Sequence, residues 1–98
     1  MKAKFDYDCI VIGGGPAGLM AAIQSAAAGN RVAVLERNGV LCKKLRITGK
    51  GRCNLTIDCD FDSLMAGIPH NPKFLFSALK KFSNTDIISF FQEQGLKT

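Results

Sequence analysis

The sequence predicts an α/β fold that begins with a strand–helix–strand unit. Three observations support this prediction: a short apolar run ends in three glycines, an alanine-rich segment follows them, and a second apolar run ends in an acidic residue. A strand, a glycine turn, a helix and a second strand within about 30 residues form a βαβ unit. In such a unit the strands are parallel and the crossover is right-handed.

The first strand is predicted over residues 5–12, whose final run Cys-Ile-Val-Ile is continuously apolar, as in a parallel strand that is buried on both faces. Residues 17–28 are rich in alanine, the residue with the highest helix propensity. Gly29 followed by Asn30 is a typical helix stop. The second strand covers residues 31–36, so the βαβ unit spans about residues 5–36.

The chain after the βαβ unit changes character. Residues 38–62 show no clear period, and within them the segment 42–57 is a glycine-rich basic loop. We therefore predict mostly loop here, with at most one short helix.

A helical segment is predicted over residues 72–95. Residues 84–86 offer caps for its second helix, residues 87–94, which Gly95 ends. Its first helix, residues 72–82, has apolar side chains at helical spacing, which we interpret as core contacts rather than as a ligand site. They are Phe74, Leu75, Ala78, Leu79 and Phe82.

The 98 residues form at most one small domain, and a composition of 47% apolar and 21% charged residues suits a packed core. The most apolar region, residues 9–35, is interrupted by glycines and polar residues, so it lacks the ~20 apolar residues that span a membrane. Asp6 and Asp8 stand where a signal peptide carries positive charge. We expect a cytoplasmic protein with no membrane partner.

Cysteine and histidine usage argues against a metal site or a disulfide framework. The four cysteines form no Cys-x-x-Cys pair, and the chain has a single histidine, His70. Without a secretory signal, free thiols are expected. We therefore predict that these residues bind no metal.

Positive charge is concentrated in one segment of a chain whose net charge is +5. Between residues 37 and 52 there is no acidic residue, and such a run is either a solvated face or an anion site. It contains no aromatic residue for base stacking, so we expect no nucleic acid and favour a phosphate or pyrophosphate. Its six basic residues are Arg37, Lys43, Lys44, Arg46, Lys50 and Arg52.

The glycines after the first strand have the spacing of a phosphate-binding turn, Gly13-x-Gly15-x-x-Gly18. The first glycine allows the tight turn, the second allows the backbone to approach a pyrophosphate, and the third allows helix and strand to pack closely. The helix that follows presents free N–H groups and a positive dipole end. Gly14 and Pro16 further shape the turn.

Glu36 lies eighteen residues beyond Gly18, at the end of the second strand. This is close to the spacing of a carboxylate that accepts hydrogen bonds from a ribose. The alternative is an ordinary glycine turn beside a solvated Glu36. An acid here disfavours the 2′-phosphate of NADP, and these residues leave NAD and FAD open. The pattern of a P-loop is absent from the sequence.

A second anion cradle is predicted in the basic loop, in the sequence Thr-Gly-Lys-Gly-Arg-Cys-Asn of residues 48–54. Gly49 and Gly51 allow backbone N–H groups to converge. Lys44 and Arg52 supply charge, whereas Thr48 and Asn54 supply hydrogen bonds.

Taken together, the segments DCIVIGGGPAGLMAA, VLERN and KKLRITGKGRCNLT resemble the HI0933-like family of NAD(P)/FAD-dependent oxidoreductases. The TGxGRCN portion is far more specific than the glycine turn. The later segments FLFSALKKFS and DIISFFQEQGL resemble the helical stretch of the family, so the resemblance covers nearly the whole chain.

The resemblance implies an FAD-binding domain of the two-dinucleotide type, of which residues 1–98 are one part. Gly13, Gly15 and Gly18 would hold the pyrophosphate of FAD, and Glu36 its adenosine ribose. The implied cofactor-binding set is completed by Gly14, Pro16, Ala17, Arg37, Lys44, Leu45, Thr48, Gly49, Gly51, Arg52, Cys53 and Asn54.

Cys53 has two interpretations. Arg52 beside it favours a thiolate, and related flavoproteins with redox disulfides place a cysteine pair near this point. However, Cys42 is eleven residues away, so we favour a thiol that is packed or lies beside the flavin without redox activity.

The chain supplies two strands of a fold that needs several more, so we expect a piece of a larger protein that by itself binds FAD weakly or not at all. An exposed sheet edge offers a route to self-association.

The first function class is a flavin-dependent oxidoreductase, with NAD(P)H as reductant and a small-molecule substrate. The alternative is a non-catalytic nucleotide-binding or interaction fragment. No catalytic residue is assigned.

Overall fold

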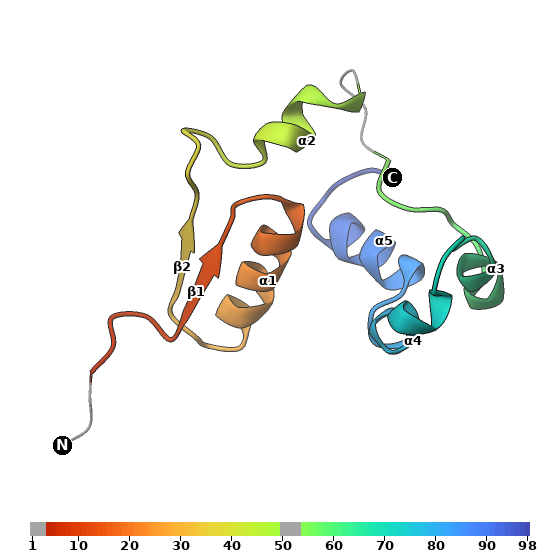
Figure 1. Cartoon of the computed structure of the whole chain (residues 1–98), viewed down its shortest axis with the longest axis horizontal. Coiled ribbons are helices and arrows are strands. Elements are labelled where there is room, and N and C mark those ends of the chain that lie inside the picture. Colours follow the sequence, from red (N-terminus) through yellow and green to blue (C-terminus); the bar gives the residue numbers. More distant parts are fainter. Residues whose placement is uncertain (1–3, 50–53) are drawn as a thin grey trace. The chain divides into compact units, whose positions relative to one another are not determined.

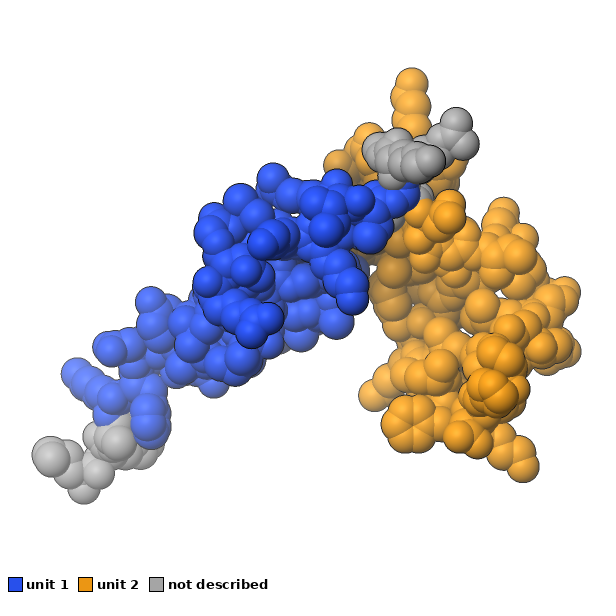
Figure 2. All heavy atoms as spheres, turned by 45° about the horizontal axis from the view of Figure 1, so that its top comes forward, with its two compact units in different colours: residues 1–53 blue, residues 54–98 orange. Residues whose placement is uncertain are grey.

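The computed structural model describes residues 4–49 and 54–98 (Figure 1). The chain divides into two compact units, Met1–Cys53 and Asn54–Thr98 (Figure 2). The first unit contains both strands and the second is helical, and each unit is described by itself.

The first unit is built on β1 (Cys9–Ile12), α1 (Pro16–Ala27) and β2 (Val32–Leu35). The two strands pair in parallel, with Cys9 opposite Val32 and Ile12 opposite Leu35. This order and pairing confirm the predicted α/β fold and its βαβ unit. A short helix, α2 (Lys43–Ile47), follows β2.

Helix α1 covers one face of the two-stranded sheet. Cys9 and Val11 of β1 are half-buried, whereas Ile10 and Ile12 on the opposite face are 55% and 78% exposed. The prediction that β1 is buried on both faces is therefore wrong for the described part of the chain. The physical reason is that one helix can cover only one side of a sheet.

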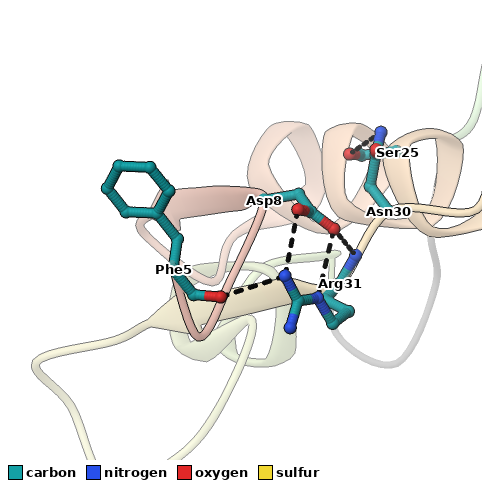
Figure 3. A network of polar contacts seen from close by, with 5 residues as sticks. All are labelled: Phe5, Asp8, Ser25, Asn30 and Arg31. Atoms are coloured by element: carbon teal, nitrogen blue, oxygen red, sulfur yellow. Dashed lines mark hydrogen bonds and ion pairs between the residues drawn. The ribbon is translucent and has the colours of Figure 1, made fainter. Parts of the chain in front are cut away.

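The beginnings of the two strands are joined by Asp8 and Arg31 (Figure 3). The Asp8 carboxylate accepts a hydrogen bond from the backbone N–H of Arg31 at 2.9 Å and pairs with its guanidinium at 3.3 Å. Arg31 Nη2 also donates to the carbonyl of Phe5 at 3.0 Å. The hydrogen bond from the Arg31 side chain lowers the pKa of Asp8. The pair is exposed, so its contribution to stability is small.

Residues 38–62 contain more helix than the sequence predicted. Besides α2, the first residues of α3 (Phe61–Ala66) fall in this segment. Helix α3 begins where it does because the Asp60 carboxylate accepts a hydrogen bond from the Ser63 backbone N–H at 2.7 Å, as an N-cap. This N-cap was not predicted from the sequence.

Helices α4 (Pro72–Lys81) and α5 (Asn84–Glu93) correspond to the predicted helical segment. Helix α5 begins three residues earlier than predicted because Ser83 is its N-cap. Ser83 and Asp86 form a capping box, in which each side chain bonds the other residue's backbone N–H. Residues 84–86 are therefore the first turn of the helix rather than the segment before it.

The apolar residues of α4 are not all core residues. Phe74 is 86% exposed and Leu75 and Phe82 are 40% and 39% exposed, whereas Leu79 is half-buried. The prediction of core contacts is therefore wrong for Phe74. The contacts between α3 and α4 involve the other side of α4, where Phe76 meets Phe61.

The most buried side chain in the described part of the second unit is polar. Asn84, only 4% exposed, donates hydrogen bonds from Nδ2 to the carbonyls of Ile57 at 2.7 Å and Cys59 at 2.9 Å. Among residues 4–49 and 54–98 no apolar side chain is fully buried. Asn84 thus ties the segment before α3 to the start of α5.

Candidate functional site

The glycine turn follows β1 directly and leads into α1. Gly13 has φ +101°, which favours glycine, and its N–H donates to the Leu35 carbonyl at 2.8 Å. Gly15 is the N-cap of α1 and Pro16 its first residue. No side chain caps this helix and no acid lies in its first turn, so its first N–H groups keep their capacity to bind an anion.

Each glycine of the fingerprint has a different steric environment. A Cβ at Gly18 would overlap the carbonyl oxygen of Gly13, so no other residue fits without moving the backbone. A Cβ at Gly15 would meet nothing within 4 Å. Gly18 is thus required for close packing, as the sequence predicted. Gly15 borders open space, and its contact with a pyrophosphate stays a prediction.

The middle residue of the turn, Gly14, is also constrained. A Cβ there would lie 2.5 Å from Leu41 Cδ2 and 3.3 Å from Glu36 Cβ. The carbonyl of Gly14 accepts a hydrogen bond from the Cys42 N–H at 2.8 Å. Sequence reasoning missed Leu41 and Cys42, and nothing in the fingerprint spacing points to them. Cys42 does have φ +54°, which fixes the bend into α2.

Glu36 is bound to the turn by its own carboxylate. Oε1 accepts a hydrogen bond from the Gly14 N–H at 2.9 Å, and Oε2 accepts one from the Asn38 N–H at 2.7 Å. The bond from Asn38, followed by that from Gly14, lowers the pKa of the Glu36 carboxyl. Glu36 is therefore a carboxylate at neutral pH, positioned beside the glycine turn.

A hollow of about 750 Å³ lies at the carboxyl ends of β1 and β2. This is where ligands bind in open parallel sheets. Glu36 supplies a negative charge to this hollow and Arg37 a positive one. The lining residues are Ile12, Gly13, Val34, Leu35, Glu36, Arg37 and Asn38.

The second motif is described only in part. Lys44 and Leu45 lie on α2, and both are exposed. Thr48 Oγ1 donates to the Leu45 carbonyl at 3.1 Å, and Gly49 has φ +74°. Asn54 begins the second unit and is exposed. The remaining predicted residues, Gly51, Arg52 and Cys53, lie outside the described residues, so both interpretations of Cys53 stay predictions.

Within the first unit, the structure brings together the residues of the glycine turn and Glu36. Pro16 and Ala17 lie at the start of α1, and Arg37 is exposed beside Glu36.

The described residues contain no cluster of His, Cys, Asp and Glu that suits a metal ion, and Cys9, Cys42 and Cys59 are free thiols. In the same part of the chain, every helix is too short or too polar to cross a membrane.

Comparison with known proteins identifies relatives of the chain. The family model for the HI0933-like protein Rossmann domain matches residues 7–98, which confirms the resemblance that the motifs indicated. A ribosomal RNA dihydrouridine synthase of Haemophilus influenzae is 38% identical over 88 residues, 89% of this chain and 21% of that protein. The protein of the same name from Escherichia coli is 32% identical over 90 residues, 92% of this chain and 22% of that protein.

A shorter match joins the chain to one of the opine oxidase subunits of Agrobacterium tumefaciens. The two are 59% identical over 32 residues, 33% of this chain and 6% of that protein. The chain therefore spans about a fifth of the length of the two dihydrouridine synthases and a smaller share of the oxidase protein.

Proposed function

The chain belongs to the HI0933-like Rossmann domain family, and on that premise we propose that it is the FAD-binding segment of an oxidoreductase that reduces uridine in ribosomal RNA. The family gives the chain a nucleotide-binding fold of flavoprotein type. The observation that carries the cofactor part of the proposal is the bond from the Gly14 N–H to Glu36, which holds a carboxylate beside the phosphate-binding turn.

The residues of the turn suit a dinucleotide. The uncapped N-terminus of α1 and the open space beside Gly15 accommodate a pyrophosphate. Each Glu36 oxygen already accepts one backbone N–H, and a carboxylate oxygen has capacity for a second bond, here from a ribose hydroxyl. Lys44, Thr48 and Gly49 extend the proposed site from α2 onward.

The substrate class follows from the two relatives that align with about nine-tenths of the chain, both named as ribosomal RNA dihydrouridine synthases. Forming dihydrouridine adds a hydride and a proton across the C5–C6 double bond of uracil. A bound flavin supplies this two-electron chemistry. NAD(P)H is the proposed reductant, and is oxidised to NAD(P)⁺ as the uracil is reduced.

This proposal replaces two expectations from the sequence, a small organic substrate and the absence of nucleic acid. The second had rested on the lack of aromatic residues between positions 37 and 52, which concerns only that segment. A location in the cytoplasm, where ribosomes are found, is part of the proposal. The shorter match, to a protein named as an oxidase subunit, supports oxidoreductase chemistry without favouring that substrate.

The test uses the protein as its own gene encodes it, with whatever follows Thr98. We expect it to purify with FAD and, given NADH or NADPH, to convert uridine to dihydrouridine in unmodified ribosomal RNA, as measured by mass spectrometry of the nucleosides. Glu36→Ala should lower the flavin content, whereas the matched control Glu93→Ala, an exposed acid of α5, should not.

Three outcomes would count against the proposal. A protein that neither carries FAD nor binds it on titration has no flavin site of this kind. A protein that carries FAD but leaves ribosomal RNA unchanged acts on another substrate. A stop codon directly after codon 98 would favour the non-catalytic fragment instead. The 98-residue chain alone is expected to bind FAD weakly or not at all.

A further inference from the structure

We propose that the outward face of α4 is a contact surface for single-stranded RNA, on which Phe74 stacks against a base and lysines bind the flanking phosphates. We call this surface the α4 face and define it by Lys73, Phe74, Ser77 and Lys81. The inference rests on the proposed function, because it assumes an RNA substrate, and it names a binding surface for that substrate outside the dinucleotide site.

Helical geometry separates the α4 face from the side of α4 that packs. At 100° per residue, Lys73, Phe74, Ser77 and Lys81 fall within one arc of about 100°. All four are exposed. The apolar residues Leu75, Phe76 and Leu79 fall on the opposite side.

The packing side of α4 already has its own aromatic contacts. The rings of Phe76 and Phe61 meet edge-to-face with centroids 5.6 Å apart. Lys80 Nζ lies 4.3 Å from the centroid of the Phe61 ring, a cation–π contact that uses this lysine within the unit. Phe74 takes no part in these contacts and is 86% exposed, against 46% for Phe76.

Charge complementarity selects the ligand. Helix α4 contains Lys73, Lys80 and Lys81 and no acidic residue. An apolar protein segment that covered Phe74 would have to desolvate Lys73 and Lys81 beside it, which is unfavourable. A single strand of RNA instead offers a base to the ring and phosphates to the ammonium groups, which is how proteins bind such strands.

A hollow beside the ring gives the base a place to lie. It has a volume of about 780 Å³ and is formed by residues 70–75, around the start of α4. This volume lies within the range of small-ligand sites. His70 and Asn71 contribute hydrogen-bonding groups next to Phe74.

The experiment measures binding of a single-stranded oligouridylate to the FAD-loaded protein, encoded by its own gene, by fluorescence anisotropy over a range of salt concentrations. Phe74→Ala should weaken binding by about 5- to 150-fold, because one base stack is lost. Phe74→Trp should keep the affinity. Phe74→Leu, which is apolar but cannot stack, should be as weak as the alanine variant.

The lysines are tested through the salt dependence. Lys81→Gln should reduce the slope of log affinity against log salt by about 0.7, the value for one phosphate contact on a single strand. The matched controls are Lys97→Gln and Ile57→Ala, which remove an exposed charge and an exposed apolar side chain outside α4. Both controls should leave affinity and slope unchanged.

Three results would overturn the inference. The first is unchanged oligouridylate affinity in Phe74→Ala. The second is equal affinity in Phe74→Leu and the unsubstituted protein. The third is a lowered unfolding midpoint in Phe74→Ala that Phe74→Leu restores, which would identify Phe74 as covered by another part of the protein. Dihydrouridine formation by the unsubstituted protein distinguishes failure of the α4 face from failure of the proposed function. If the unsubstituted protein forms dihydrouridine and the Phe74 variants form it at the same rate, only the α4 face is rejected.

Discussion

The two units of this chain stabilise their local structure in different ways. In Met1–Cys53, backbone groups of the glycine turn bond distant residues, as in Cys42 N–H to the Gly14 carbonyl and Gly14 N–H to the Glu36 carboxylate. In Asn54–Thr98, side chains make the decisive bonds, as at the capping residue Ser83 and at Asn84.

This difference predicts which kinds of substitution should affect each unit. In the first unit the groups proposed to bind the cofactor pyrophosphate are backbone N–H groups, so a substitution of a turn glycine acts there by adding a Cβ. In the second unit the groups available to a partner are side chains on the surface of a helix, which can be changed without changing the fold. Substitutions in the two units test this comparison, from the largest expected effect to the smallest.

Gly18→Ala should have the largest effect on stability. Its Cβ would overlap the Gly13 carbonyl oxygen, and the backbone would have to move. We expect a loss of about 3 kcal/mol in the free energy of unfolding, measured by urea denaturation of the full chain. Gly15→Ala is the matched control, since its Cβ meets nothing and it should cost less than about 1 kcal/mol. Equal losses would contradict the steric argument.

Asn84→Ala should destabilise the second unit most. It removes two hydrogen bonds and leaves the Ile57 and Cys59 carbonyls without that donor, a loss of about 2 kcal/mol. Asn84→Asp separates this role from helix capping, because an acid favours a helix N-terminus but cannot donate these bonds. If Asn84→Asp were as stable as the unsubstituted chain in the same urea denaturation, the side-chain bonds would not be the anchor.

Gly14→Ala tests the contact between the turn and the loop after β2. The clash is with the end of the Leu41 side chain, at 2.5 Å, so we expect a loss of about 1 to 2 kcal/mol. Leu41→Ala in the same chain should relieve it. A double-mutant cycle should give a coupling of about 1 kcal/mol. Additive effects would show that Leu41 does not restrict Gly14.

Lowering the pH tests the bonds of Glu36, with the smallest expected effect. Its pKa in the folded chain is held below the ordinary value of 4.5, chiefly by the Asn38 N–H. The stabilisation is therefore fully present above about pH 4.5 and is lost as the pH falls through the folded pKa. Glu36→Gln should lack this component. The measurement is the difference in unfolding free energy between the two proteins from about pH 6 to about pH 3, where Asp8 and Asp60 contribute equally to both. A constant difference would contradict the prediction.

Much of the first unit could be predicted from the sequence because its signals are local. A glycine fingerprint between two apolar runs, and Glu36 at the end of the second, indicated the βαβ unit and the residues that meet at the turn. The contact of Leu41 with Gly14 could not be predicted, since it depends on how the loop after β2 returns to the turn. The N-cap at Asp60 was missed although its signal, an acid before a helix, is also local.

The sequence by itself determined the class of fold, the position of the glycine turn and the family of the chain, because residue spacing and glycine content act within a few residues. Only the tertiary structure decided which apolar side chains are covered. Ile12 and Phe74 have the sequence pattern of core residues, but burial depends on what packs against each face, and within the described residues nothing covers either side chain. The same physics allows Phe74, beside its lysines, to serve as a surface for a partner.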